Sequence, residues 1–154
     1  MTTHAKRDER NNQEFEAALA AGKPSISIDA LNSGPVALAA DEEDMGNLPN
    51  VLHLCLGARV MVTRNLCISH GICNGTIGIV HDILVNSTGF VEAVVIKVRR
   101  ATATQDGYKG PSFPGATEGV DLATEALVAI NRRSTDIWTK EGQSEERSQF
   151  PLML

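Results

Sequence analysis

The stretch that decides the fold is residues 57–80, GARVMVTRNLCISHGICNGTIGIV. Its first part alternates Val60 and Val62 with longer or polar side chains, which is the period of a half-buried strand. Its last part, residues 76–80, is rich in β-branched side chains and follows Asn74-Gly75 directly. Asn-Gly suits the positive φ angles of a tight type I′ turn. The stretch therefore predicts two antiparallel strands joined through a loop and a hairpin turn.

Working outward, further short apolar runs predict strands, and these lie at residues 25–30, 51–56, 77–84, 90–98, 127–130 and 136–139. Residues 8–21 predict an amphipathic helix, with Phe15, Ala18 and Leu19 on one face. The acidic segment 31–50 and the Gly-rich and Thr-rich segment 99–119 are predicted as loops. Short strands joined by tight turns between about residues 56 and 140 predict a small antiparallel barrel in a mainly β chain of the α+β class.

The composition predicts an aliphatic core, because only 4% of the 154 residues are aromatic. The net charge of -5 excludes a protein that coats nucleic acid, since nonspecific phosphate binding needs a basic footprint. The charge is unevenly distributed, however. Residues 46–140 hold nine basic and seven acidic side chains, so this middle region carries +2 while both flanks are acidic. A local contact with nucleic acid therefore stays open.

Cysteine usage and the N-terminal composition predict an intracellular protein. The three cysteines, Cys55, Cys67 and Cys73, are an odd number, which is typical of free thiols in a reducing compartment. The first twelve residues are polar and lack the apolar core of a secretory signal. No apolar run approaches the length that spans a bilayer.

The search for chemical motifs yields one cluster of metal-ligand types, Cys67-x2-His70-x2-Cys73. It offers three of the four ligands that zinc takes, and His53 or Cys55 could be the fourth. The favoured interpretation is that Cys67 and Cys73 are small apolar side chains in a loop, so no metal site is expected. The chain has no Walker A loop, no nucleophile elbow and no His-Glu-x-x-His. We therefore expect no catalytic residues.

Several basic residues are candidates for phosphate contacts, and an ordinary solvated charge is the alternative for each. They are Arg64, Arg99, Arg100, Lys109, Arg132 and Arg133. Three aromatic side chains could stack on bases, namely Tyr108, Phe113 and Trp138. Because each of them buries a large area, the core is the favoured location for all three.

Four segments in order, GARVMVTRN (57–65), NGTIG (74–78), YKGPSFP (108–114) and RSQFPLML (147–154), resemble consecutive landmarks of the Pif-one-type, RecD-like group of superfamily one DNA helicases. The resemblance implies three parts. Residues 1–56 would be a partial RecA-like segment, residues 57–140 an inserted SH3-like barrel, and residues 141–154 the return to the RecA-like domain.

The resemblance implies a parent enzyme that hydrolyses ATP with Mg²⁺ and moves along single-stranded DNA, 5′ to 3′. This chain would be a fragment of it, inactive alone, without a cofactor of its own, and without the Walker A and Walker B motifs. Its expected partners are single-stranded DNA, held weakly, and the remaining helicase domains. The expected location is the nucleus or cytoplasm, or for the parent enzyme the mitochondrion. By position, the expected DNA contacts are Arg64, Asn65, Asn74, Gly75, Lys109, Arg147 and Gln149.

Two alternatives stay open at this point. The barrel could be a protein-interaction module that binds a partner through its exposed edges or its acidic loop, without nucleic acid. The chain could also be a gene remnant with no function.

Overall fold

The computed structural model describes residues 24–115 and 117–154, together with isolated positions of the N-terminal segment: Glu9, Gln13, Glu16, Ala17, Ala20 and Gly22. The described positions between 9 and 20 are helical and exposed, as a helix over residues 8–21 predicts. The predicted apolar face of that helix, Phe15, Ala18 and Leu19, lies outside the described residues.

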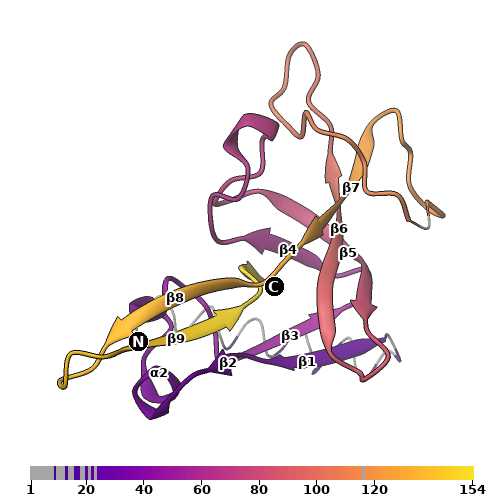
Figure 1. The fold of residues 1–154 in the computed structure, drawn as a ribbon. Coiled ribbons are helices and arrows are strands. Elements are labelled where there is room, and N and C mark those ends of the chain that lie inside the picture. The colour runs from indigo at the N-terminus through magenta and orange to yellow at the C-terminus, as the bar shows by residue number, and fades with distance from the viewer. Residues whose placement is uncertain are drawn as a thin grey trace.

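The described strands form three antiparallel sheets (Figure 1). A two-stranded sheet pairs β1 (Ser25–Asp29) with β3 (Val51–Cys55). A three-stranded sheet has the order β2 (Leu31–Asn32), β9 (Ser144–Gln149), β8 (Arg133–Trp138). A five-stranded sheet has the order β10 (Leu152–Met153), β4 (Arg59–Val62), β5 (Ile77–Val85), β6 (Val91–Arg99), β7 (Glu125–Ile130). Helix α2 (Pro35–Ala39) and the 3₁₀ helices η1 (Glu43–Met45) and η2 (Ile68–His70) lie between strands. The predicted mainly β, α+β class is confirmed.

The alternating pattern of the opening stretch places its side chains as predicted. In β4, Val60 and Val62 are buried while Arg59 is exposed, so one face of the strand meets the core. Strand β4 pairs with β5, and Val60 lies opposite Gly78. The strands predicted around residues 25–30, 51–56, 77–84 and 90–98 are all present, each within one or two residues of its predicted bounds.

The predicted barrel is not closed. The five-stranded sheet ends at β10 on one side and at β7 on the other, and these two edges do not pair with each other in the described chain. The predicted closing strand at residues 136–139 belongs instead to β8, which pairs with β9 in a different sheet. The physical reason is that β9 offers β8 six directly opposed residues, from Arg133 with Gln149 to Trp138 with Ser144.

The segment 31–50 is not the solvated loop that its acidic composition predicts. It contains β2, α2 and η1, and Ala37, Met45 and Leu48 are fully buried. The segment folds around the guanidinium of Arg147, which donates hydrogen bonds to the carbonyl oxygens of Ala37 (2.6 Å), Ala40 (2.8 Å) and Leu48 (3.0 Å). Interior carbonyls require such partners, so the arginine satisfies them.

The core is aliphatic, as the composition predicts, with two aromatic exceptions. Phe150 is fully buried and Tyr108 is 8% exposed, and both belong to the core cluster, which takes side chains from the five-stranded and the two-stranded sheets. Phe113 is half-buried. Trp138 is 71% exposed, so the prediction that it lies in the core was wrong. It lies in β8, on a sheet face that no other described element covers.

Candidate nucleic-acid interface

The loop between β4 and β5, residues 63–76, contains most of the predicted DNA-binding residues. A bridge pairs Cys67 with Ile72, and η2 lies inside it. Gly71 ends η2 with a φ of 86°, and a Cβ at this position would lie 2.3 Å from the carbonyl oxygen of Gly107. Only glycine allows this close approach to the neighbouring backbone.

The turn at the end of this loop differs from the predicted type. The backbone N–H of Thr76 donates to the carbonyl of Cys73 (3.0 Å), which defines a four-residue turn with Asn74 and Gly75 at its centre. Gly75 has a φ of 100°, but Asn74 is not among the described residues with positive φ. A positive φ at the second central residue alone is the pattern of a type II turn, not of type I′. The reason is that the turn closes a loop instead of joining two strands directly.

Three predicted site residues meet at this turn. The side-chain oxygen of Asn65 accepts a hydrogen bond from the backbone N–H of Asn74 (2.8 Å), and the N–H of Gly75 donates to the carbonyl of Val62 (2.8 Å). Asn65, Asn74 and Gly75 are all exposed. The Asn65 side chain therefore fixes the turn, and the side chain of Asn74 is exposed to solvent.

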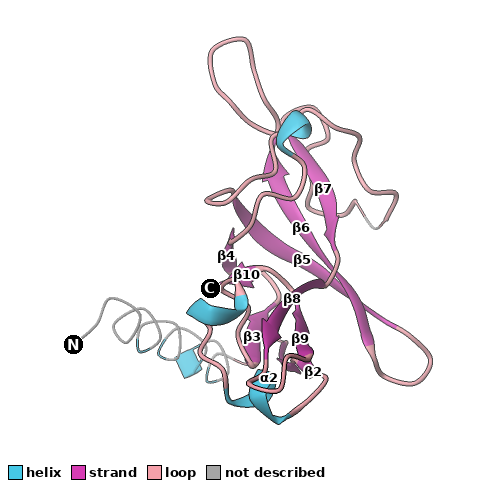
Figure 2. Cartoon of the chain, turned by 60° about the vertical axis from the view of Figure 1, so that its left-hand side comes forward, coloured by secondary structure: helices cyan, strands magenta, loops and turns pink. Residues whose placement is uncertain are grey.

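The loop that follows β6 packs against η2 and brings Lys109 to the same end of the sheet. The backbone N–H of Lys109 donates to the carbonyl of His70 (2.8 Å), and its side chain is exposed. Beside it, the hydroxyl of Tyr108 donates to the carbonyl of Pro111 (2.7 Å). Burial raises the pKa of Tyr108, so this phenol stays protonated. Figure 2 shows the long loops gathered at the end of the sheet remote from α2, β8 and β9.

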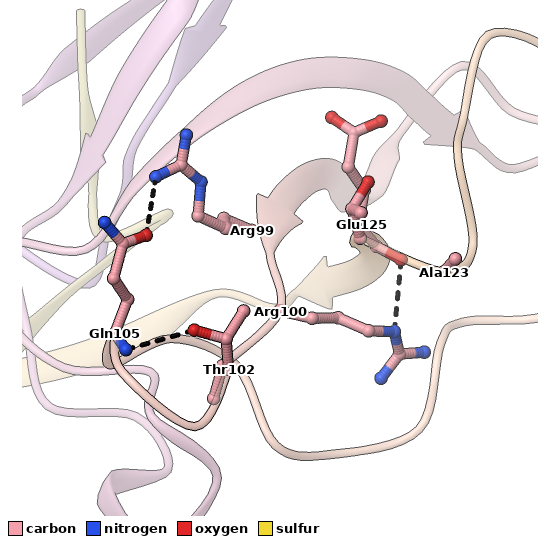
Figure 3. Close-up of a pocket in the computed structure, with 8 residues that line it drawn as sticks. Arg99, Arg100, Thr102, Gln105, Ala123 and Glu125 are labelled. Carbon is pink, nitrogen blue, oxygen red and sulfur yellow. Dashed lines mark hydrogen bonds between the residues drawn. The ribbon is translucent and has the colours of Figure 1, made fainter.

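Two hollows open at this end, and Arg99 at the end of β6 lines both. One, of about 400 Å³, is bordered by Asn74, Gly75, Gly107 and Tyr108. The other, of about 420 Å³, lies between the start of the loop and the residues before β7 (Figure 3). The guanidinium of Arg99 donates to the side-chain oxygen of Gln105 (3.2 Å) and is otherwise open to solvent. Its position as the shared wall of two hollows is not readable from the sequence, because it depends on where the loop folds back.

Arg100, the next residue, has a structural role. Its guanidinium donates to the carbonyls of Gly110 (3.0 Å) and Leu122 (3.2 Å) in the loop and of Glu125 (3.2 Å) in β7, so it ties the loop to β7. Figure 3 shows the contact with Glu125. Arginine can do this because its planar fork presents several donors at once.

Arg64 points away from the loop end. Its guanidinium donates to the carbonyl of Gly46 (3.1 Å) and to the hydroxyl of Thr135, so it connects the end of β4 to η1 and β8. Burial, and secondarily the positive charge of Arg133, lower the pKa of Arg64. Sequence proximity placed Arg64 beside Asn65, but the structure separates the two side chains.

Arg132 lies where the chain passes from β7 to β8. Its guanidinium carbon is 4.8 Å from the ring centroid of Phe90 and 4.8 Å from that of Phe150, so the cation is held between two aromatic rings. Burial lowers its pKa. The contact joins the β5–β6 turn to the crossing between β9 and β10.

Comparison with known proteins finds one family model that matches part of the chain and solved structures that share its fold. Residues 44–83 match the family model of the 2B domain of DNA helicase Pif1. The crystal structure of Pif1 helicase from Candida albicans has the same fold over 100% of this chain, with a TM-score of 0.59 and 18% sequence identity. Over its whole length the chain therefore shares the fold of one part of that helicase. It covers 33% of the Candida protein.

Two other solved Pif1 structures are similar to the chain at lower TM-scores. A double mutant of Pif1 from Bacteroides has a TM-score of 0.50 and 17% identity, over 92% of this chain and 27% of that one. A structure described as the basis for DNA unwinding at forked double-stranded DNA by two coordinating Pif1 helicases has a TM-score of 0.49 and 18% identity, over 93% and 26% of the two chains. The chain thus spans a third or less of these helicases. No curated protein matches its sequence.

The Pif1 match divides the predicted site residues. Arg64, Asn65, Asn74 and Gly75 lie within the matched range 44–83, whereas Lys109, Arg147 and Gln149 lie beyond it. Arg147 and Gln149 are 1% and 0% exposed. The Gln149 amide donates to the carbonyl of Ile28 (2.9 Å), so both side chains are engaged inside the protein in this conformation.

The part of the chain that the structure describes holds neither a metal-ligand cluster nor a membrane-spanning helix. No three His, Cys, Asp or Glu side chains there gather into a group that could hold a metal ion. No described helix is long and apolar enough to cross a membrane.

Proposed function

We propose that this chain is the DNA-facing part of a Pif1-type helicase, and that the loop end of its five-stranded sheet contacts single-stranded DNA. The observation that carries the proposal is the hollow of about 400 Å³ that joins the Asn74-Gly75 turn to Arg99. The contact surface consists of Asn65, Asn74, Gly75, Arg99 and Lys109.

The chemistry of this surface suits a single strand. Arg99 and Lys109 supply exposed cations for phosphate oxygens, and the side-chain amides of Asn65 and Asn74 supply neutral hydrogen-bonding groups. Tyr108, whose hydroxyl donates to the carbonyl of Pro111, also lines the hollow. Asn74, Gly75 and Arg99 line this hollow together with Asp106, while Asn65 and Lys109 are exposed on the two loops that border it. A single cation or amide would be an ordinary surface group, but several of them on one surface match the backbone of a nucleotide chain.

The activity of the whole helicase is part of the same proposal. ATP hydrolysis with Mg²⁺ and 5′ to 3′ translocation are assigned to the parent enzyme, and this chain contributes DNA contact without a nucleotide site of its own. The other helicase domains are its natural partners. An intracellular location, in the nucleus, cytoplasm or mitochondrion, follows from the same proposal.

The test is a fluorescence-anisotropy titration of the full chain against a labelled single-stranded oligonucleotide at low and moderate salt. If the two cations of this surface each contact one phosphate, log affinity falls with log salt at a slope of about -1.4. Arg99→Gln and Lys109→Gln should each reduce the slope by about 0.7, since each removes one phosphate contact. The matched control is Lys140→Gln, because Lys140 is exposed but lies in the β8–β9 turn.

Two outcomes would contradict the proposal. Absence of binding at low salt would favour the protein-interaction module instead. Equal weakening by Lys140→Gln would show that the chain binds DNA through its overall charge and not through the loop end.

A further inference from the structure

The three-stranded sheet has one covered and one open face. On the covered face, α2 and η1 contact β8 and β9, and Arg147 bonds to the carbonyls of α2. The open face carries exposed side chains only, apart from the half-buried Ser148. We call it the tryptophan face, and it consists of Leu31, Ser134, Asp136, Trp138, Ser144, Glu146 and Ser148.

The strand register defines the order of groups on this face. Trp138 lies opposite Ser144, and Asp136 lies opposite Glu146. Directly opposed residues of an antiparallel pair share a face with Cβ atoms about 5 Å apart, and like charges in such a pair are unfavourable. Neither carboxylate forms an ion pair with any group in the described part of the chain. Within the described residues, two negative charges without an ion-pair partner thus lie side by side next to an exposed tryptophan.

The Trp138 ring and the Asp136–Glu146 pair favour the same kind of ligand, a cation. An exposed tryptophan ring attracts a cation over its face, most often a guanidinium. A pair of carboxylates attracts the same group through charge-assisted hydrogen bonds. We propose that the tryptophan face is the docking site for an extended, arginine-containing protein segment.

The spacing of the groups gives the segment a pattern. Side chains on one face of a strand recur every second residue, about 6.7 Å apart. Trp138 and Asp136 are two residues apart in β8, so an Arg-x-Arg segment places one guanidinium on the ring and the next on the carboxylate pair. Ser134 lies two residues before Asp136 and is opposite Ser148 of β9. Ser148 is in turn opposite Leu31 of β2, which is 50% exposed. An apolar residue fits there, which gives the pattern Arg-x-Arg-x-Leu.

This site is distinct from the DNA-binding surface and does not rest on it. The carboxylates of Asp136 and Glu146 repel phosphate, whereas the DNA loops lie at the remote end of the other sheet (Figure 2). A failure of DNA binding would leave this proposal unaffected.

The experiment uses the fact that Trp138 is the single tryptophan of the chain. The full chain is titrated with the peptide acetyl-Arg-Ser-Arg-Ser-Leu-amide while tryptophan emission is recorded. A saturable, salt-sensitive change in emission is expected. The peptide acetyl-Glu-Ser-Glu-Ser-Leu-amide should produce none.

Variants then locate the contact. Asp136→Asn with Glu146→Gln should weaken binding about fivefold, the effect of losing two exposed ion pairs. The matched control, Glu92→Gln with Glu118→Gln, removes two exposed carboxylates elsewhere and should leave affinity unchanged. With a fluorescein-labelled peptide read by anisotropy, Trp138→Ala should weaken binding about tenfold. These positions are exposed, so the variants retain the fold.

The proposal is overturned if emission shows no saturable change up to about 1 mM of the basic peptide. It is equally overturned if the acidic peptide binds as well as the basic one, or if single-stranded DNA produces the saturable change instead.

Discussion

Lys109 and Arg147 carry the same charge, and the sequence predicts a DNA contact for both, but the structure places them in opposite environments. Lys109 is exposed at the loop end of the five-stranded sheet, whereas Arg147 is 1% exposed inside the fold of residues 31–50. A basic residue in a segment that predicts DNA contact can therefore serve as a hydrogen-bond donor inside the protein. A guanidinium offers several N–H groups in a fixed plane, and carbonyls of a compact loop can use them all.

The largest expected effect is on the interior side of this comparison. Arg147→Met leaves the buried carbonyls of Ala37, Ala40 and Leu48 without their donor. Each buried group that loses its partner costs about 1 to 3 kcal/mol, so the free energy of unfolding should fall by at least about 3 kcal/mol. Urea unfolding followed by circular dichroism measures this. Arg147→Lys keeps the charge but loses the planar guanidinium, so its free energy of unfolding should lie between those of the wild type and Arg147→Met. A loss below about 1 kcal/mol for Arg147→Met would refute the anchoring role.

The next effect concerns the framework of the loop end. Gly71→Ala combines a φ of 86° with a clash against the carbonyl of Gly107, so the loop must shift. We expect a cost of more than about 2 kcal/mol, together with weaker DNA binding. Gly75→Ala is the matched control, because its φ is also positive but nothing lies within 4 Å of an added Cβ. Urea unfolding of both variants measures the two losses in the free energy of unfolding. Equal losses would mean that the loop relieves the clash at Gly71→Ala by shifting without further destabilisation.

A smaller effect is expected where a side chain fixes the turn. Asn65→Ala removes the hydrogen bond to the backbone N–H of Asn74. Because both groups are exposed and water replaces the lost acceptor, the free energy of unfolding should change by about 1 kcal/mol or less. Amide hydrogen exchange at Asn74 should accelerate. Unchanged exchange at that amide would show that the turn holds without the Asn65 side chain.

The smallest effect on stability is expected at Lys109. Lys109→Gln should change the free energy of unfolding by less than about 0.5 kcal/mol, since the side chain is exposed. The same variant should still weaken DNA binding in the anisotropy titration. A destabilisation comparable to that of Arg147→Met would erase the contrast between the two cations.

The strands were predictable because their patterns are local. Alternating Val and Ile define β4, β5 and β6, and each of these strands lies within one or two residues of its prediction. The neighbourhood of Asn65, Asn74 and Gly75 could likewise be predicted, because the three positions lie within ten residues of one another.

The missed features depend on distant partners. Residues 31–50 read as solvated because Met45 and Leu48 are surrounded by acidic and turn residues, while the arginine that organises them lies 99 positions beyond Leu48. The barrel failed to close for a similar reason, since β8 pairs with a strand whose sequence, SEERSQ, has no apolar alternation. The burial of Arg147 and Gln149 gives no local signal either, since both are polar residues of that strand.

The arginine held between two phenylalanines has a consequence for sequence variation among relatives. Arg132, Phe90 and Phe150 come from three separate stretches of the chain, and the guanidinium carbon lies 4.8 Å from the centroid of each ring. Loss of either ring exposes one side of the guanidinium, and loss of the guanidinium leaves a gap between the rings. These three positions should therefore vary together: a relative that lacks arginine at position 132 is expected to carry a different pair at 90 and 150.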